Sequence, residues 1–479
     1  MTAHALSGAA IGASALAGNP GQVPGPTVRA TQHALDQLKA ALSPAIATLP
    51  LGGSDGVSSL LLALPRVPTS LPQLSGPHFH FRHIDRGELR AGYGSAAEWS
   101  AEGPGRLHRL AEIARQLRPA WSRSDPHQTG LEAFAMLGFA ATPDSAPMIE
   151  DHLPNALFWI PEVGIRASGG SAALVLSAAL PVDPGQLQAR WTRLLEDLVP
   201  QLYGPVDGPR MPARLDYEFA EPDRSGWTEL VDGALSEIAR GDLQKVVLSR
   251  RLDVTGTRSF DVNRLLGALG CLFPSCQVLN LRRNGSSFVA ATPERLLSKR
   301  GRDIEVDAIA GTAPRDADVA LDAALAQALR SSDKNLREHR FVIDAIRSAL
   351  DPFCRQIEVP AEPELMQLSN AQHLWTQIQA QADEEVDVFK LAERLHPTPA
   401  TNGQPRHAAS SWLQAEEPFQ RGWYTGVAGA VEPDLSGDLW VLLRCARVCG
   451  ARAELYAGAG IVRGSDSQRE WEETEAKLN

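Results

Sequence analysis

Residues 227–250 read WTELVDGALSEIARGDLQKVVLSR and carry the sharpest structural signals in the chain. Apolar residues at helical spacing predict an amphipathic helix over Trp227–Arg240, and Gly241-Asp242 predicts the turn that follows it. The next run, Lys245-Val246-Val247-Leu248-Ser249-Arg250, is rich in valine and leucine and predicts a strand. A helix, a tight turn and a strand therefore open the second half of the chain.

Downstream of this unit, helical and strand patterns alternate irregularly to residue 479, with strands expected at Leu439–Arg444 and Glu454–Ala457. No period of 20–50 residues marks a repeat array. Because strict βαβ alternation is absent, the pattern favours an α+β fold with sizeable sheets flanked by helices.

Upstream, the signals are weaker. Apolar runs at 156–161 and 172–176 predict buried strands, a helix is expected near Thr31–Leu42, and another over Pro184–Val199 should stop at Pro200. We divide the chain into a disordered tail (1–30), an N-terminal scaffold part (31–225) and a catalytic region (226–479).

Composition narrows the class of protein. The chain has 479 residues, 43% of them apolar and 22% charged, and a net charge of -11. The acidic balance argues against a nucleic-acid partner, and the longest apolar runs are too short for a membrane span. The five cysteines show no zinc spacing, so we interpret them as buried free thiols of a cytoplasmic protein.

The C-terminal segment Glu470-Trp471-Glu472-Glu473-Thr474-Glu475-Ala476-Lys477 is the most informative local pattern. On a helix, Glu470, Glu473 and Lys477 share one face. Two carboxylates beside an ammonium can bind magnesium and an anion, since hard cations prefer oxygen ligands. A solvated helix with ordinary charge pairs explains the same segment.

Three further features have one functional and one structural interpretation each. Lys245, at the head of a valine-rich strand, is either a buried base or an edge lysine whose stem reaches solvent, because burial favours the neutral amine. Glu294 presents a carboxyl group after a strand or begins a helix. Gly458 and Gly460, between a strand and the last helix, offer backbone N–H groups to an anion or form a bend.

A second acidic site opens a long helix that continues to Leu350. There Glu338 is a candidate metal ligand or a residue that stabilises the helix dipole. His339 next to it is interpreted as a structural hydrogen-bonding residue, since no second histidine has suitable spacing for a metal.

Taken in order, these segments resemble the chorismate-binding catalytic region shared by isochorismate, salicylate, anthranilate and aminodeoxychorismate synthases. The resemblance covers roughly the last 250 residues. It is carried by residues 245–250, 291–294, 310–313, 334–339, 372–375, 396–400, 443–444, 457–462 and 470–477.

The resemblance implies a single large α+β fold, in which two extended antiparallel sheets pack as a core with helices around a deep site. It implies Mg²⁺ as cofactor, held by Glu338 and Glu473 and supported by Glu470 through the water shell, with the metal on the ring carboxylate of chorismate. The remaining substrate positions that it implies are Thr312, His373, Ala400, Thr401, Tyr424, Arg444, Gly458, Gly460 and Lys477.

In the water-adding members of the family, the residue that matches Lys245 takes a proton from the water that attacks C2. The residue that matches Glu294 protonates the departing C4 hydroxyl. Both roles require a pKa moved toward neutrality, in the direction that burial drives each group.

Ala400 resembles the isochorismate synthase form, because the salicylate-forming relatives carry threonine there. We therefore expect an isomerase that makes isochorismate, with salicylate synthase and an aminating enzyme as alternatives and a non-catalytic chorismate-binding protein as the alternative from another class.

Two positions depart from the pattern. Thr401 replaces the leucine or valine usual in isochorismate synthases, at a position that helps to select the nucleophile. Asn335 replaces an acidic residue common three positions before the metal-binding glutamate. No glutaminase segment is evident, so we expect a monomer with no obligatory glutaminase partner, and the downstream pathway (menaquinone, siderophore or salicylate) stays open.

Overall fold

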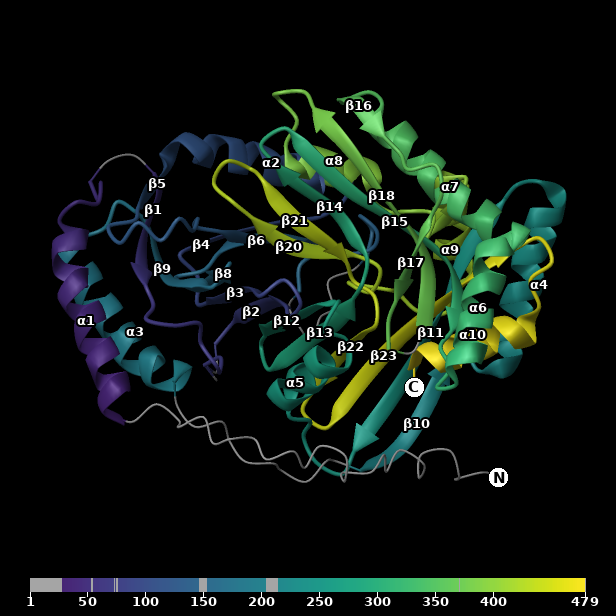
Figure 1. Cartoon of the computed structure of the whole chain (residues 1–479), viewed down its shortest axis with the longest axis horizontal. Helices are drawn as coiled ribbons and strands as arrows, with labels where there is room; N and C mark the ends of the chain where they lie inside the picture. The colour runs from purple at the N-terminus through teal and green to yellow at the C-terminus, as the bar shows by residue number, and fades with distance from the viewer. Residues whose placement is uncertain are drawn as a thin grey trace.

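Two large β-sheets pack face to face in the structure, a computed structural model that describes residues 28–478 apart from 53–54, 73, 75, 146–152, 204–213 and 370 (Figure 1). Helices cover the outer surfaces of both sheets. The arrangement confirms the expected α+β fold with two extended sheets. The ladders are antiparallel throughout the described chain except between β1 and β5, which pair parallel.

The larger sheet has thirteen strands among the described residues. In spatial order they are β10 (Leu215–Glu221), β11 (Lys245–Gly256), β23 (Arg452–Val462), β22 (Cys445–Cys449), β13 (Ser286–Thr292), β12 (Gln277–Arg283), β2 (His78–His83), β3 (Glu88–Tyr93), β8 (Val163–Ser168), β9 (Ser171–Leu180), β1 (Gly56–Ala63) and β5 (Trp121–Ser124), with β19 (Gly403–Gln404) paired to β11.

The smaller sheet has ten strands within the same described ranges. Their order is β16 (Cys354–Glu358), β18 (Ala371–Ala382), β15 (Asp303–Pro314), β14 (Arg295–Arg300), β21 (Gly437–Val441), β20 (Val427–Val431), β6 (Ala135–Phe139), β7 (Ala156–Ile160) and β4 (Ala97–Ala101), with β17 (Glu364–Gln367) paired to β18.

The helices follow the chain between these strands. They are α1 (Val28–Ile46), α2 (Arg106–Leu117), the short 3-10 helix η1 (Arg118–Ala120), α3 (Pro184–Leu202), α4 (Arg224–Arg240), α5 (Val262–Leu272), α6 (Val319–Ser331), α7 (Asp333–Leu350), α8 (Val388–Leu395), α9 (Arg406–Glu416) and α10 (Ser467–Leu478).

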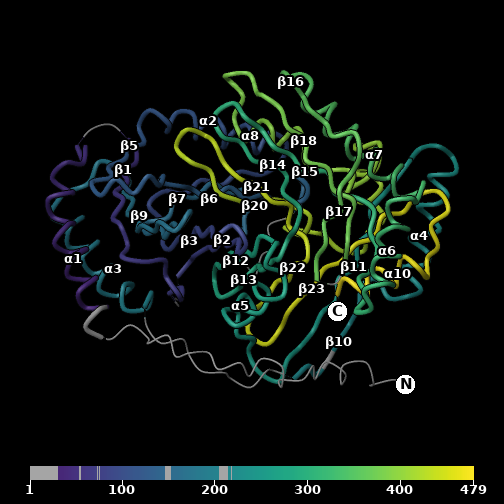
Figure 2. The backbone as a smooth tube through the Cα atoms, in the orientation of Figure 1, coloured from purple at the N-terminus to yellow at the C-terminus, as the bar shows by residue number. Residues whose placement is uncertain are grey.

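Both sheets join the two halves of the chain. In the larger sheet β2 pairs with β12, and in the smaller sheet β6 pairs with β20. Figure 2 shows α1 at one end of the molecule and α4 and α10 at the other, with β20 and β21 beside β6 between them. The scaffold part and the catalytic region therefore share their sheets, as a single fold requires.

Five apolar clusters lie among the described residues, and three of them position the site. The main core lies between the sheets and includes Phe79, Leu137 and Ile378. A second core packs α1 and α3 on the outer face of β1, β8 and β9. A third packs α4 and α9 on the outer face of β11 and β23. The inner faces of β11 and β23 are thereby left to line a site between the sheets.

Several local features differ from the sequence expectations. Helix α3 continues past Pro200 to Leu202 because Val199 and Leu202 are buried in the second core, so the predicted stop was wrong. Helix α1 begins at Val28, inside the expected tail, whose first 27 residues lie outside the described part of the chain. Cys271 and Cys449 are exposed, whereas Cys276 and Cys445 are buried as expected.

Across the described ranges, no helix is long and apolar enough to cross a membrane.

Candidate active site

One cavity between the sheets collects the side chains singled out from the sequence. Glu470 is the exception and lies outside the lining. The cavity is lined by Lys245, Val247, Pro293, Glu294, Ile309, Ala310, Gly311, Thr312, Glu338, His373, Ala400, Thr401, Tyr424, Thr425, Leu443, Arg444, Tyr456, Ala457, Gly458, Gly460, Glu473 and Lys477. We call it the central cavity.

Strand β11 places Lys245 in the central cavity by simple alternation. Val246 and Leu248 point to the third core, so Lys245 and Val247 point to the opposite face. Lys245 is 1% exposed, which excludes the edge lysine that reaches solvent. Its Nζ donates to Glu338 Oε1 at 2.7 Å, so a buried ion pair occupies one wall.

Glu294 lies between β13 and β14 and not at the start of a helix, so the structural alternative for this residue was wrong. It is 5% exposed. Burial raises the pKa of Glu294 to about 8, against the opposing charge of Lys245 and the hydrogen bond from Thr398. At neutral pH this carboxyl group therefore carries a proton, which is the form a general acid needs.

The three glutamates expected to bind magnesium are each paired with a lysine. Glu338 accepts from Lys245, Glu473 accepts from Lys477 at 2.7 Å, and Glu470 lies 3.6 Å from Lys334. Among the described residues, no three His, Cys, Asp or Glu side chains stand together as a metal site.

The donor set nevertheless has the chemistry of a magnesium site. Burial raises the pKa of Glu470, and the charges of Glu473 and Glu338 raise it further, so the three carboxylates act on one another electrostatically. Burial disfavours the charged form of Glu338, but Lys245 and the lysines beyond it hold the pKa of Glu338 below its ordinary value. Carboxylate oxygens of this kind are the ligands that a hard divalent cation prefers.

The end of the cavity near β18 is cationic. The Arg444 guanidinium donates to His373 Nε2 at 3.2 Å, and His373 Nδ1 contacts Thr312 Oγ1 at 3.0 Å. Because a guanidinium can only donate, Nε2 accepts and the ring proton is on Nδ1. Burial, together with Arg444 and Lys477, lowers the pKa of His373 to about 3, so this ring is neutral.

The backbone at Arg444 is in the left-handed region, with φ of 48°. A non-glycine residue with this conformation is uncommon and often belongs to a functional site. Here it accompanies a guanidinium that lines the cavity. The cationic end can bind carboxylates, with Arg444 suited to two-point contact and Lys477 to a point charge.

Gly458 and Gly460 lie within β23 and not in the loop that the sequence suggested. Val247 N donates to Asn402 O and Ser249 N to Glu417 Oε1, so the register pairs Val247–Gly460 and Ser249–Gly458 are not hydrogen-bonded to each other. In an antiparallel ladder the N–H groups of such residues point away from the partner strand. Both glycine N–H groups therefore point away from β11 and toward α10, whose Lys477 Nζ donates to Gly458 O at 2.8 Å.

These two glycines also leave room for their neighbours. A Cβ on Gly458 would lie 2.8 Å from Tyr424 Oη, and one on Gly460 would lie 3.1 Å from both Lys245 Cε and Glu338 Oε1. A side chain at either position would therefore push on the candidate catalytic groups.

Helix α10 is held against the sheet by Arg250. Its guanidinium donates to Thr474 Oγ1 and Glu475 Oε1, both at 2.7 Å, and lies over the Trp471 ring. This anchoring orients the helix so that Glu473 and Lys477 face the cavity, whereas Glu470 is buried beside Lys334.

Sequence reasoning assigned no role to Thr398, which lies within the quoted segment 396–400. Its Oγ1 donates to Glu294 Oε1 at 3.4 Å. The apolar walls Val247 and Ile309 and the ring of Tyr456, stacked on Tyr424, were also missed. For Val247 the period-2 alternation from Lys245 was the available signal, while the others depend on tertiary packing. His339, in contrast, is the expected structural residue and contacts Thr376 Oγ1 at 2.8 Å.

The arrangement combines a buried lysine, a protonated carboxyl group and a cationic end in one cavity between two sheets. Such a combination is of the class that can perform acid–base chemistry on a small anionic ligand.

Comparison with known proteins identifies the family. The family model described as "Chorismate binding enzyme" matches residues 64–479, and the chain belongs to this family. The resemblance predicted from the sequence is thereby confirmed.

Several relatives in sequence are named isochorismate synthases. The salicylate biosynthesis isochorismate synthase of Pseudomonas aeruginosa is 36% identical over 57% of this chain and 56% of its own length. The isochorismate synthase DhbC of Bacillus subtilis is 37% identical over 65% of this chain and 81% of its own length. The match to the Pseudomonas protein thus spans little more than half of that relative, as does the match to Bacillus subtilis MenF, at 55%.

Solved structures agree on the fold. MenF, the menaquinone-specific isochorismate synthase from Escherichia coli, superposes with a TM-score of 0.76 at 26% identity and covers 93% of this chain and 97% of that one. Anthranilate synthase component I from Streptococcus pneumoniae, with a TM-score of 0.67 at 20% identity over 85% of this chain and 92% of that one, shares the fold alone.

Proposed function

We propose that the protein is an isochorismate synthase, an isomerase that adds water at C2 of chorismate as the C4 hydroxyl departs. The observation that carries this proposal is the pairing of Lys245 with Glu294 on the lining of one cavity, with Glu294 held protonated by burial. The names of relatives about 36% identical over half of the chain support the same reaction.

In the proposed reaction, Glu294 is the general acid and Lys245 the general base. Lys245 takes a proton from water as the water oxygen bonds to C2. The double bond shifts, the C4–O bond breaks, and Glu294 gives its proton to the departing hydroxyl, which leaves as water. One water enters and one leaves, so the product is an isomer of the substrate.

The cationic end of the cavity is the proposed site for the substrate's carboxylates. Arg444 and Lys477 supply the charges, and the N–H groups of Gly458 and Gly460 supply directed donors. The neutral His373 holds Arg444 in place by accepting from it. Thr312, Ala400, Thr401 and Tyr424 complete the walls.

We propose Mg²⁺ as the cofactor, held by Glu338 and Glu473 with Glu470 in support. The chemistry it would supply is neutralisation and orientation of the ring carboxylate. The carboxylate donor set described above supports this assignment.

Lys245 must change partners before it acts as a base. In the structure its Nζ donates to Glu338 Oε1 at 2.7 Å, and this contact occupies the nitrogen that would accept a proton from water. The base role requires that Lys245 leave this partner. If Glu338 bound another partner, the Lys245 amine would therefore be released.

Product analysis tests the proposal directly. The purified protein is incubated with chorismate and Mg²⁺, with and without ammonium, and the products are separated by chromatography. Isochorismate in both mixtures is the expected result. Pyruvate together with salicylate would show a salicylate synthase instead, and an amino product that requires ammonium would show an aminating enzyme.

Thr401 makes amination the rival with a specific structural basis. Thr401 lines the central cavity and carries a hydroxyl group, where the expected leucine or valine would be apolar.

Binding of chorismate without any turnover would support a non-catalytic binding protein. The relatives' names span salicylate, menaquinone and, for a putative Bacillus anthracis enzyme, 2,3-dihydroxybenzoate, so they leave the pathway open. A monomer without a glutaminase partner stays a prediction.

A further inference from the structure

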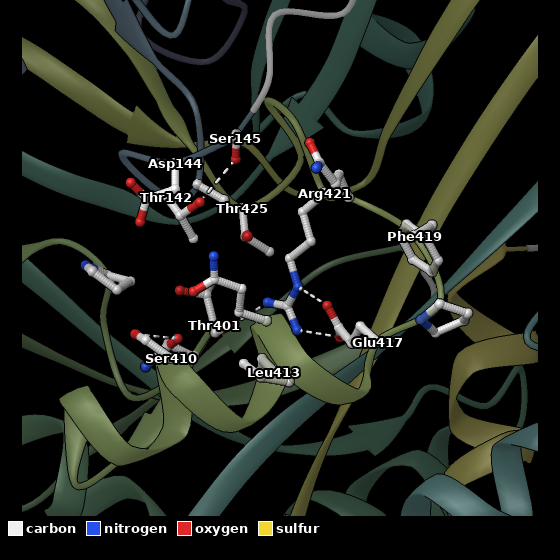
Figure 3. A pocket seen from close by; sticks show the side chains of 16 residues that line it. Thr142, Asp144, Ser145, Thr401, Ser410, Leu413, Glu417, Phe419, Arg421 and Thr425 are labelled. Atoms are coloured by element: carbon white, nitrogen blue, oxygen red, sulfur yellow. Dashed lines mark hydrogen bonds and ion pairs between the residues drawn. The ribbon is translucent and has the colours of Figure 1, made fainter. Parts of the chain in front are cut away.

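A second cavity lies behind the central one. It is lined by polar and apolar side chains of residues 141–145, 397–402 and 417–425 and of helix α9, among them Asp144, Ser410 and Leu413. Figure 3 shows these side chains around a hollow, with Arg421 extending between Thr401 and Glu417. The polar groups on this lining offer the hydrogen-bond partners that a water molecule needs. We call it the outer cavity.

The two cavities share part of their walls. Thr401 and Thr425 are on the lining of both. Thr401 is 2% and Thr425 3% exposed, so these buried residues form a wall between the outer cavity and the central one.

Hydroxyl groups connect the outer cavity to Glu294. Thr401 Oγ1 lies 3.3 Å from Thr398 Oγ1, and Thr398 Oγ1 donates to Glu294 Oε1 at 3.4 Å. Because Thr398 donates its single proton to Glu294, Thr401 must be the donor between the two threonines. The carbonyl oxygen of Thr398 lies 3.4 Å from Thr401 Oγ1 and competes with Thr398 Oγ1 as the acceptor of the Thr401 hydroxyl proton.

The backbone of Thr401 is fixed against β11. Arg421 donates from Nη1 to Thr401 O at 2.7 Å and from Nη2 to Val247 O at 2.6 Å, while Glu417 holds the guanidinium in an ion pair. The hydroxyl chain is therefore built on a rigid support.

We propose that Thr398 and Thr401 are positioning residues that relay a proton from water in the outer cavity to Glu294 after each turnover. This inference rests on the proposed function, in which Glu294 ends a turnover as a carboxylate. Water gives a proton to Thr401 Oγ1, the Thr401 proton passes to Thr398 Oγ1, and the Thr398 proton passes to Glu294. Each O–H bond that breaks is replaced by one that forms, and the proton that Lys245 releases to solvent neutralises the hydroxide left in the outer cavity, so that water is restored.

Burial limits the routes by which Glu294 can regain a proton. Glu294 is 5% exposed and its open side is the central cavity, which substrate or product would fill. The charged groups that face it are Lys245 from β11 and Asp307 from β15. Asp307 is bound by Arg295 at 3.2 Å, and Lys245 is separated from Glu294 by the position that the product would take. The hydroxyl chain of Thr401 and Thr398 reaches Glu294 on a side that neither the product nor these two charged groups would occupy.

Thr401→Val tests the relay, because valine has the shape of threonine without the hydroxyl. In rapid-quench assays with chorismate and Mg²⁺, we expect the first turnover of this variant at the wild-type rate, followed by a steady state about fivefold slower. The traces should then show a burst of about one isochorismate per site. KM should stay within about twofold of wild type.

Matched variants control the result. Thr401→Ser restores the hydroxyl and should restore the steady-state rate. Ser410→Ala removes a hydroxyl from the same outer cavity, where Ser410 donates to Asn402 Oδ1, and should leave both phases unchanged. Thr398→Val interrupts the chain one step nearer to Glu294 and should show the same burst, which keeps the test open if Thr401→Val does not fold.

The outcomes separate the relay from the function it rests on. Wild-type protein that makes no isochorismate would overturn the proposed function. Active wild type with an unchanged steady state in Thr401→Val would overturn the relay alone. A first turnover slowed as much as the steady state would also overturn it, because that result marks a change in the chemical step.

Discussion

The two ends of the larger sheet bury different kinds of side chain. Beneath α1 and α3, the outer face of β1 and β9 presents Leu60, Leu62, Leu174 and Leu176, all fully buried in an apolar core. At the other end, the inner face of β11 presents Lys245. The same ladder geometry thus supports an apolar core at one end and buried charge at the other.

The difference shows where stability and chemistry reside. Each fully buried leucine contributes about 1.5–3 kcal/mol to folding, whereas buried ionised groups lose hydration and return little of that cost through pairing. We infer that the end beneath α1 and α3 stabilises the sheet on which the charged site is built. Substitutions in the central cavity should therefore mainly lower turnover, whereas substitutions beneath α1 and α3 should mainly lower the free energy of unfolding.

Lys245→Ala should have the largest effect. Loss of the proposed base should lower turnover by up to about 10⁴-fold, to the limit of detection, while chorismate binding is largely kept. Chromatographic product assays and equilibrium titration with chorismate measure the two quantities. Normal isochorismate formation by this variant would refute the mechanism.

Glu294→Gln should follow, with a loss of about 10²–10³-fold in kcat, because the amide cannot supply the proton. The pH dependence is a second readout. With a pKa of about 8, wild-type activity that needs protonated Glu294 should decline as pH rises through about 8.

The same substitution should change stability in a defined direction. The pKa of Glu294 is raised from 4.5 in an ordinary setting to about 8 in the folded protein. The stability associated with its protonated form is complete below about pH 4.5 and lost as pH rises through about 8. Glu294→Gln should therefore be more stable than wild type at pH 8, by on the order of a few kcal/mol, and the gap should shrink toward pH 4.5. Urea unfolding at both values checks this, and an equal gap at the two would contradict it.

Leu174→Ala tests the apolar end. Leu174 is 0% exposed, so removing its side chain should cost about 2–5 kcal/mol of unfolding free energy. Turnover of the remaining folded protein should equal that of wild type, because the residue is remote from the central cavity. A kcat that fell in proportion to stability would break the distinction between the two ends.

Gly460→Ala should have the smallest effect of this set. The added Cβ would lie 3.1 Å from Lys245 Cε and Glu338 Oε1, so these side chains must shift by a few tenths of an ångström. We expect kcat to fall about tenfold, since small misplacements of catalytic groups are costly. Gly233→Ala on α4 is the matched control. The added Cβ would lie 3.6 Å from its nearest neighbour, an ordinary contact, so kcat should be unchanged.

Part of the site followed from local periodicity. The valine-rich run 245–250 predicted a strand with Lys245 at its head, and helical spacing put Glu473 and Lys477 on one face. These patterns are readable because strand and helix repeats act over a few residues. The order of the motifs was enough to predict the family.

Other features could not be read in this way. Pro200 did not end α3, because burial of Leu202 outweighed the local signal. Gly458 and Gly460 appeared to form a loop, but pairing with β11, more than 200 residues earlier, drew them into a strand. Glu470 shares a helical face with Glu473 yet turns to Lys334.

The sequence by itself determined which residue types are available: a lysine at the head of a strand, a carboxyl after another, and an acidic face on the last helix. Only the tertiary structure decided that these groups meet in one cavity, that Lys245 pairs with Glu338 and that Thr398 connects Glu294 to Thr401. The physical reason is that the pKa and the partner of a group depend on burial and on neighbours. Long-range sheet register sets both, whereas local spacing sets only which side of an element a residue faces.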